Sequence, residues 1–122
     1  MATLSNDVLD AALEYISGNT NKVQVVTSAS AVLVSKASGI TSADFGAAGD
    51  NSGSGGGRKI TCLTGSDFNG IAVSSAGSAS KVRLLASSTV VCTTSITSAP
   101  ISLGASDEVN IGSFSVIIKD PS

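Results

Sequence analysis

The sequence predicts a mainly β fold, an antiparallel β-sandwich or barrel with one N-terminal amphipathic α-helix. Three observations predict it. Val, Ile, Thr and Ser are abundant while charged residues make up only 13% of the chain, a composition typical of strands whose outer faces carry neutral hydroxyls. Short apolar segments recur from residue 22 onwards between Gly- and Ser-rich turns. The first 20 residues alone repeat with helical spacing. A length of 122 residues suits a single domain over 1–122.

The helix is expected within residues 1–20. Ser5 is a good N-cap, and Gly18 follows the apolar stripe as a stop signal. Asp7, Asp10 and Glu14 would form the outward face. The residues expected to dock the helix on the rest of the domain are Val8, Leu9, Ala12, Leu13 and Ile16.

The strands are expected mainly in a β-rich core over 58–122. Before this core, two strands are predicted over 22–27 and 31–36. Within it, strands are predicted over 58–64 and 70–75, followed by a hairpin over 80–95 that turns at Ser87–Ser88. A last pair should flank the turn Gly104–Asp107. The apolar alternation changes parity after Ile111, which predicts a β-bulge at Gly112–Ser113.

Residues 37–57 are expected to form a flexible Gly/Ser-rich loop. The stretch GDNSGSGGGRKI, from Gly49 to Ile60, resembles a phosphate-binding loop at first sight. A Walker A loop needs a glycine directly before its lysine and a Ser or Thr after it, and it opens a helix. Here Arg58 and Ile60 occupy those places, and a strand follows. The stretch Gly53–Gly57 therefore predicts a hinge.

The loop carries apolar and acidic side chains that a plain surface loop would more often lack. They suggest an arm reaching a neighbouring subunit, and a cluster folding back onto the domain's own core is an equally good interpretation. The residues expected to contact a partner are Ile40, Asp44, Phe45, Arg58 and Lys59.

The sequence predicts no catalytic site, no cofactor and no metal. It contains no His, so Ser–His–Asp and Cys–His arrangements are impossible. Asp107 and Glu108 sit in a turn, where solvated carboxylates are the simpler interpretation. Asp44, Asp50 and Asn51 could ligate a cation, but their spacing matches no calcium loop. We therefore expect a protein that is not an enzyme.

Cys62 and Cys92 are expected to be unpaired, buried thiols. The first residues lack a basic segment followed by an apolar core, so we expect no export signal and a reducing compartment. A disulfide would require the two strands to be neighbours.

Charge and hydropathy argue against nucleic acid and membrane as partners. The net charge is −2 and the seven basic residues are scattered, whereas nucleic-acid binding needs clustered positive charge. No apolar run approaches the roughly 20 residues that span a bilayer.

Four segments together resemble a group of small virion structural proteins of tailed bacteriophages. They are MATLSNDVLDAALEYI, GRKIT, KVRLLAS and FSVIIKDP. The chain departs from that group between Val26 and Asp50. The resemblance implies a virion protein assembled in the host cytoplasm, with the major capsid protein or other virion proteins as partners.

Three functions follow as hypotheses. The first is a capsid decoration (cement) protein that binds and stabilises the assembled head, as a homo-oligomer and possibly a trimer. The second is a tail, neck or fibre-attachment subunit. The third, ranked last because the chain is only 3% aromatic, is a host-directed carbohydrate-binding module.

Overall fold

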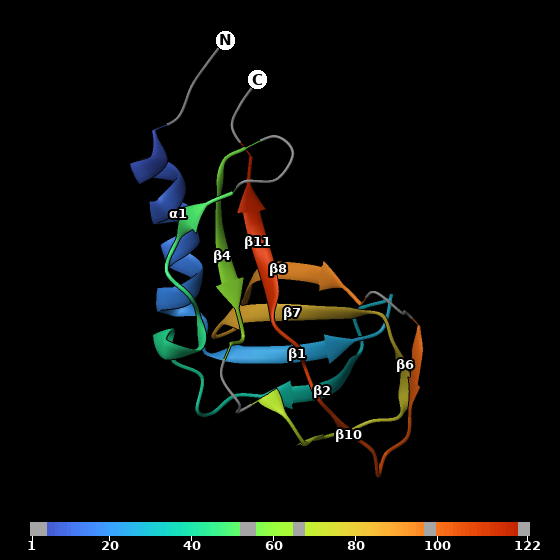
Figure 1. The fold of residues 1–122 in the computed structure, drawn as a ribbon. Coiled ribbons are helices and arrows are strands. Elements are labelled where there is room, and N and C mark those ends of the chain that lie inside the picture. The colour runs from blue at the N-terminus through green and yellow to red at the C-terminus, as the bar shows by residue number, and fades with distance from the viewer. Residues whose placement is uncertain (1–4, 52–55, 65–67, 97–99, 120–122) are drawn as a thin grey trace.

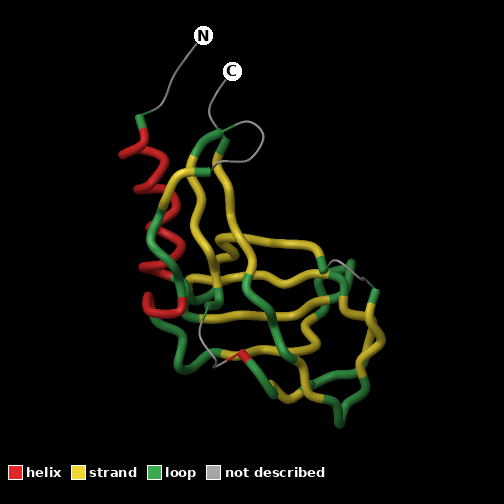
Figure 2. Tube along the Cα trace, in the orientation of Figure 1, coloured by secondary structure: helices red, strands yellow, loops and turns green. Residues whose placement is uncertain are grey.

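The computed structural model describes residues 5–51, 56–64, 68–96 and 100–119. It confirms a mainly β fold with one N-terminal α-helix, in which every strand pairing is antiparallel (Figure 1). A four-stranded sheet and a three-stranded sheet carry most of the pairing. In Figure 1 the long strands of the second sheet run across those of the first, and in Figure 2 the helix lies along one side of the strands. This arrangement is consistent with the sandwich alternative.

The four-stranded sheet has the order β2-β1-β7-β8. Its strands are β1 (Lys22–Val26), β2 (Val32–Lys36), β7 (Lys81–Ala86) and β8 (Thr89–Ser95). The predicted hairpin turning at Ser87–Ser88 is confirmed, because β7 and β8 pair directly on either side of it. The two central strands β1 and β7 bury alternate side chains, whereas no residue of the edge strand β8 is buried.

The three-stranded sheet has the order β11-β4-β3. Its strands are β3 (Gly49–Asp50), β4 (Arg58–Cys62) and β11 (Phe114–Ile118). The helix α1 (Asn6–Asn19) packs on this sheet and on the short 3-10 helix η1 (Ser42–Asp44). Ile60 and Cys62 of β4 are both buried in the core.

Two small sheets replace the predicted last pair of strands. They join β5 (Ile71–Ala72) to β10 (Glu108–Val109), and β6 (Gly77–Ala79) to β9 (Ile101–Leu103). The turn at Gly104–Asp107 exists, with the Asp107 N–H donating to the Gly104 carbonyl at 3.0 Å. The strands on either side of the turn pair with earlier segments and not with each other, so that pairing was wrong.

Gly112 and Ser113 do not form the predicted bulge; they link two different sheets. β10 ends at Val109 and β11 begins at Phe114 in a different sheet. The link is held by Ile111, whose N–H donates to the Phe68 carbonyl at 2.8 Å and whose side chain is buried. Changing sheets changes which parity faces the core, and a bulge would produce the same pattern in sequence.

The helix begins as predicted but docks by a narrower stripe. The Ser5 hydroxyl accepts from the Val8 N–H at 3.4 Å. The helix passes through Gly18 and ends at Asn19, so the predicted stop is wrong by about one residue. Its buried residues are Leu9, Leu13 and Ile16. Val8 is 52% exposed and Ala12 is also exposed, so their predicted docking role is not observed.

The described part of segment 37–57 is folded onto its own domain. Ile40 and Phe45 belong to the hydrophobic core. The Gly46 N–H donates to the Thr61 carbonyl and the Thr64 N–H to the Asp44 carbonyl, each at 2.8 Å. The segment therefore follows the alternative interpretation, a cluster that packs on the domain's own core.

The two described glycines at the end of that segment are held by hydrogen bonds. Gly53–Gly55 lie outside the described residues, but Gly56 and Gly57 adopt positive φ values of 61° and 89°. The Asn51 side chain donates to the Gly56 carbonyl at 2.8 Å, and its N–H donates to the Gly57 carbonyl at 3.0 Å. Asn51 thus holds Gly56 and Gly57 in place directly before β4.

Candidate functional site

The carboxylates considered as ligands or acids have separate structural roles. Asp44 completes a capping box, in which its Oδ2 accepts from the Thr41 N–H at 2.9 Å. The Asp50 side chain is 82% exposed and lies 3.9 Å from Arg58. Asp107 Oδ2 accepts from the Gly104 N–H within the turn at 2.6 Å. Among the described residues, no three Asp, Glu, Cys or His side chains gather as metal ligands would.

The residues predicted to contact a partner lie mostly inside the domain. Ile40, Asp44 and Phe45 are at most 9% exposed, so a partner cannot reach them in this conformation. Arg58 pairs with Asp10, with Nε to Oδ1 at 2.7 Å and Nη2 to Oδ2 at 3.0 Å. This two-pronged contact ties α1 to β4, and hydrogen bonding to Asp10 raises the pKa of Arg58.

Asp10 was therefore wrongly placed on the outward face of the helix. Lys59, the neighbour of Arg58 in β4, is partly exposed. It is the only one of the five predicted contact residues whose side chain is neither buried nor paired with a carboxylate among the described residues.

The two cysteines are free, as the sequence predicted. Cys62 is fully buried and Cys92 is half-buried. Burial, with a smaller effect from Cys92, raises the pKa of the Cys62 thiol to about 12. Burial also raises the pKa of Cys92. Both thiols are thus poor nucleophiles at neutral pH, because the thiolate is the reactive form.

The last third of the chain, residues 87–119, carries three of the six exposed large apolar side chains among the described residues, those of Val90, Ile101 and Ile117. Among its described residues Ile111 alone is buried, although the segment is rich in Val and Ile. The sequence from Ser87 to Ile118 contains only two charged residues, Asp107 and Glu108. Many of its apolar side chains pack against the core on one side and remain partly exposed on the other.

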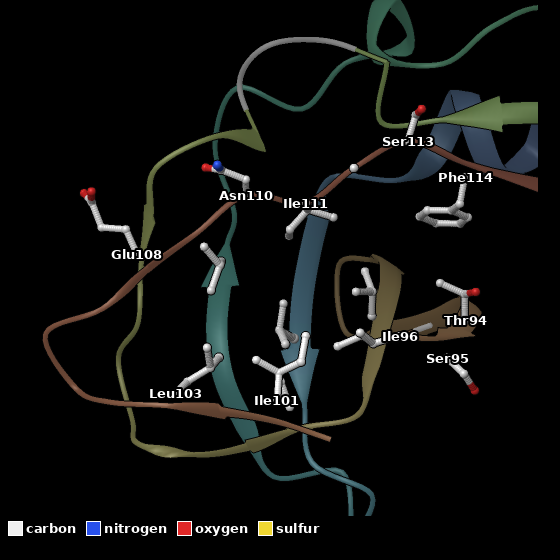
Figure 3. A pocket seen from close by; sticks show the side chains of 15 residues that line it. Thr94, Ser95, Ile96, Ile101, Leu103, Glu108, Asn110, Ile111, Ser113 and Phe114 are labelled. Atoms are coloured by element: carbon white, nitrogen blue, oxygen red, sulfur yellow. The ribbon is translucent and has the colours of Figure 1, made fainter. Parts of the chain in front are cut away.

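A pocket of about 520 Å³ is lined mostly by residues of this last third of the chain. Val25 and Val82 of the four-stranded sheet lie among its walls. In Figure 3 the side chains of Ile96, Ile101 and Ile111 converge on the pocket, whereas Glu108 points away from it. The pocket is therefore largely apolar, without the convergent polar groups of a catalytic site.

Comparisons with known proteins give no family for the chain. No protein-family model, no curated protein and no solved structure matches it. In the described part of the chain, no helix is both long enough and apolar enough to cross a membrane.

The candidate site is thus a partly exposed apolar region with a pocket, which the sequence did not single out. Most of its pocket residues were predicted only as members of strands, and Gly112 and Ser113 only as a bulge. One signal was present: the apolar alternation changes parity after Ile111. In the structure both sets of side chains pack on the core, because the chain changes sheets at Gly112–Ser113.

Proposed function

We propose that this chain is a non-enzymatic virion structural protein, a capsid decoration protein that binds and stabilises the assembled head. The observation that carries the proposal is the last third of the chain, where apolar strands are left half-covered and nearly uncharged. Soluble monomers rarely leave a large apolar surface uncovered, and such surfaces mark interaction sites.

The chemistry of this surface suits a large repeating partner. On a lattice of identical subunits the local concentration of binding sites is high, so a modest neutral interface suffices and steering charge is not needed. A protein that binds only the assembled shell stabilises it by mass action. The partners would be the major capsid protein or other virion proteins, met in the host cytoplasm.

A carbohydrate-binding module is less well supported. Sugar rings stack on exposed aromatic side chains, and among the described aromatics only Tyr15, at 55%, is exposed. Phe45 and Phe68 are buried and Phe114 is half-buried.

Quantitative mass spectrometry of purified particles tests the proposal. The particles are those of the phage that encodes this chain, and the protein is counted against the major capsid protein. A copy number in the hundreds is expected for a decoration protein. A count of a few dozen or fewer would place the protein in the neck, tail or fibre attachment, and absence from the particle would overturn both virion assignments.

A further inference from the structure

The two larger sheets end in four strands that pair on one side only within the described chain. They are β2 and β8 in one sheet, and β3 and β11 in the other. Open strand edges attract other strands, and natural proteins blunt them with charge, with short length or with bulges. These four edges differ in how they are protected.

Three of the four edges carry such protection. β2 contains Lys36. β3 has two residues, one of them the exposed Asp50. β8 is interrupted by a shift in register between Leu84 and Leu85 of its partner strand, the mark of a bulge.

β11 carries none. It pairs residue for residue with β4 over five positions, from Phe114 opposite Cys62 to Ile118 opposite Arg58, with no shift. It contains no charged residue. Its sequence, FSVII, combines aromatic and β-branched residues, which favour strands.

We propose that β11 pairs with β11 of a second copy of this chain, antiparallel and about a two-fold axis through Val116. The two three-stranded sheets then join into one continuous sheet. Phe114 lies opposite the partner's Ile118, and Ser115 lies opposite the partner's Ile117. Symmetric pairing of this kind gives a dimer with closed symmetry.

In this register each residue of β11 lies opposite a residue of the second copy with similar burial. Phe114, Val116 and Ile118 are half-buried against the core, whereas Ser115 and Ile117 face outward. Pairing about Val116 places each half-buried residue opposite another half-buried one, so the apolar faces of both sheets become continuous. Two Phe–Ile pairs result, and aromatic residues opposite β-branched ones stabilise antiparallel sheets.

The charges nearest the interface are compatible with this register. Lys119 follows β11 directly, and the two-fold axis places it opposite the partner's Ser113. No two like charges are brought together, so nothing in β11 opposes self-pairing. The dimer forms in the purified protein and does not depend on the virion assignment, so the two proposals fail separately.

Sedimentation velocity over a range of protein concentrations tests the interface. The unmodified protein is expected to dimerise, and Ile117→Lys is expected to be monomeric because it places a charge on the joined strands. Val90→Lys is the matched control and is expected to dimerise: Val90 is 44% exposed on the other uncharged edge strand, against 45% for Ile117. Circular dichroism checks that both variants fold. An unmodified protein that stays monomeric, an Ile117→Lys dimer or a monomeric Val90→Lys would each overturn the proposal.

Cysteine cross-linking tests the register in a Cys92→Ser background. Val116→Cys lies on the axis, where the two Cα atoms are about 4.5–5.5 Å apart, within reach of a disulfide. Mild oxidation is expected to give a covalent dimer. Ser115→Cys lies one residue off the axis, too far from its own copy to bond. A covalent dimer from Ser115→Cys, or none from Val116→Cys, would overturn this pairing.

Discussion

At the scale of single residues, Gly57 is the described glycine with the least room for a side chain. Its φ is 89°, in the region that favours glycine. A Cβ at this position would collide with the Ile118 carbonyl at the end of β11 and lie 2.7 Å from the Cα of Lys119, the next residue. The sequence alone suggested a hinge here, because a run of glycines looks the same whether the backbone needs freedom or close approach.

We predict that Gly57→Ala lowers the free energy of unfolding by at least about 2 kcal/mol, from backbone strain together with the collision. Urea denaturation measures it. The control is Gly18→Ala, where nothing lies within 4 Å of the added Cβ and φ is not positive. There the change should stabilise the helix by about 0.5 kcal/mol. Equal effects of the two substitutions would contradict the close approach at Gly57.

Cys62 should make stability depend on pH in alkaline solution. Burial raises its pKa from 9.0 to about 12, so the unfolded chain loses this proton before the folded chain does. The thiol's contribution to stability is therefore complete below about pH 9 and declines as the pH rises to about 12. Each pH unit in this window costs at most about 1.4 kcal/mol.

Unfolding by urea at a series of pH values measures this slope. Cys62→Ala is the comparison: it lowers stability at neutral pH by leaving a small cavity, but its stability should fall less steeply above pH 9. If Cys62→Ala loses stability with rising pH as steeply as the parent, the pH dependence comes from groups other than Cys62.

At the scale of elements, α1 is attached to the rest of the domain by a narrow stripe of buried apolar side chains and by one ion pair. Leu13 is fully buried, and Arg58 links the helix to β4 through Asp10. Leu13→Asp would place an unpaired charge in the core, which costs several kcal/mol. We expect this variant not to fold, as judged by circular dichroism and thermal unfolding.

Val8→Asp is the matched control for the helix. Val8 is 52% exposed and lies in the first turn, where a carboxylate complements the helix dipole. It should fold with the stability of the parent or slightly more. A folded Leu13→Asp protein would show that the domain does not need the docked helix.

The sequence predicted best the elements that are formed by interactions between residues close together in the chain. The helix and the hairpin turning at Ser87–Ser88 were predictable because cap, stripe and turn lie within a few residues of one another. β3 and β6 were missed because each has only two or three residues, too few to show an alternating pattern, and each is defined by its pairing with a later strand, β4 or β9.

The candidate site was less predictable than the elements that form it. Its residues were assigned to strands, but the pocket and the open edge depend on which strands become neighbours. The pairing of β9 and β10 with β6 and β5 could not be read from the local pattern, which favoured a simple hairpin. The spacing of Thr41 and Asp44 was a capping-box signal in the sequence that the prediction of a flexible loop missed.

At the scale of the whole molecule, burial is unequal along the chain. The central strands β1 and β7 and the helix supply most of the fully buried side chains, whereas residues 87–119 supply only Ile111 among those described. The first two-thirds of the chain therefore form the stable core. The last third is attached to that core by pairing with β7, β4 and the small sheets.

Hydrogen exchange on the free protein should reflect this division. We expect the slowest exchange in β1 and β7, since their amides open only when the whole domain unfolds. Phe45 should also be well protected, because its N–H donates to the Ser42 carbonyl at 3.1 Å and its side chain is buried in the core. β8 should exchange faster, because its outer side is unpaired and local opening exposes little apolar surface. Protection of β8 equal to that of β1 would mean that this edge is already covered in the free protein. Rapid exchange at Phe45 would mean that segment 37–57 is the mobile arm first expected from its composition.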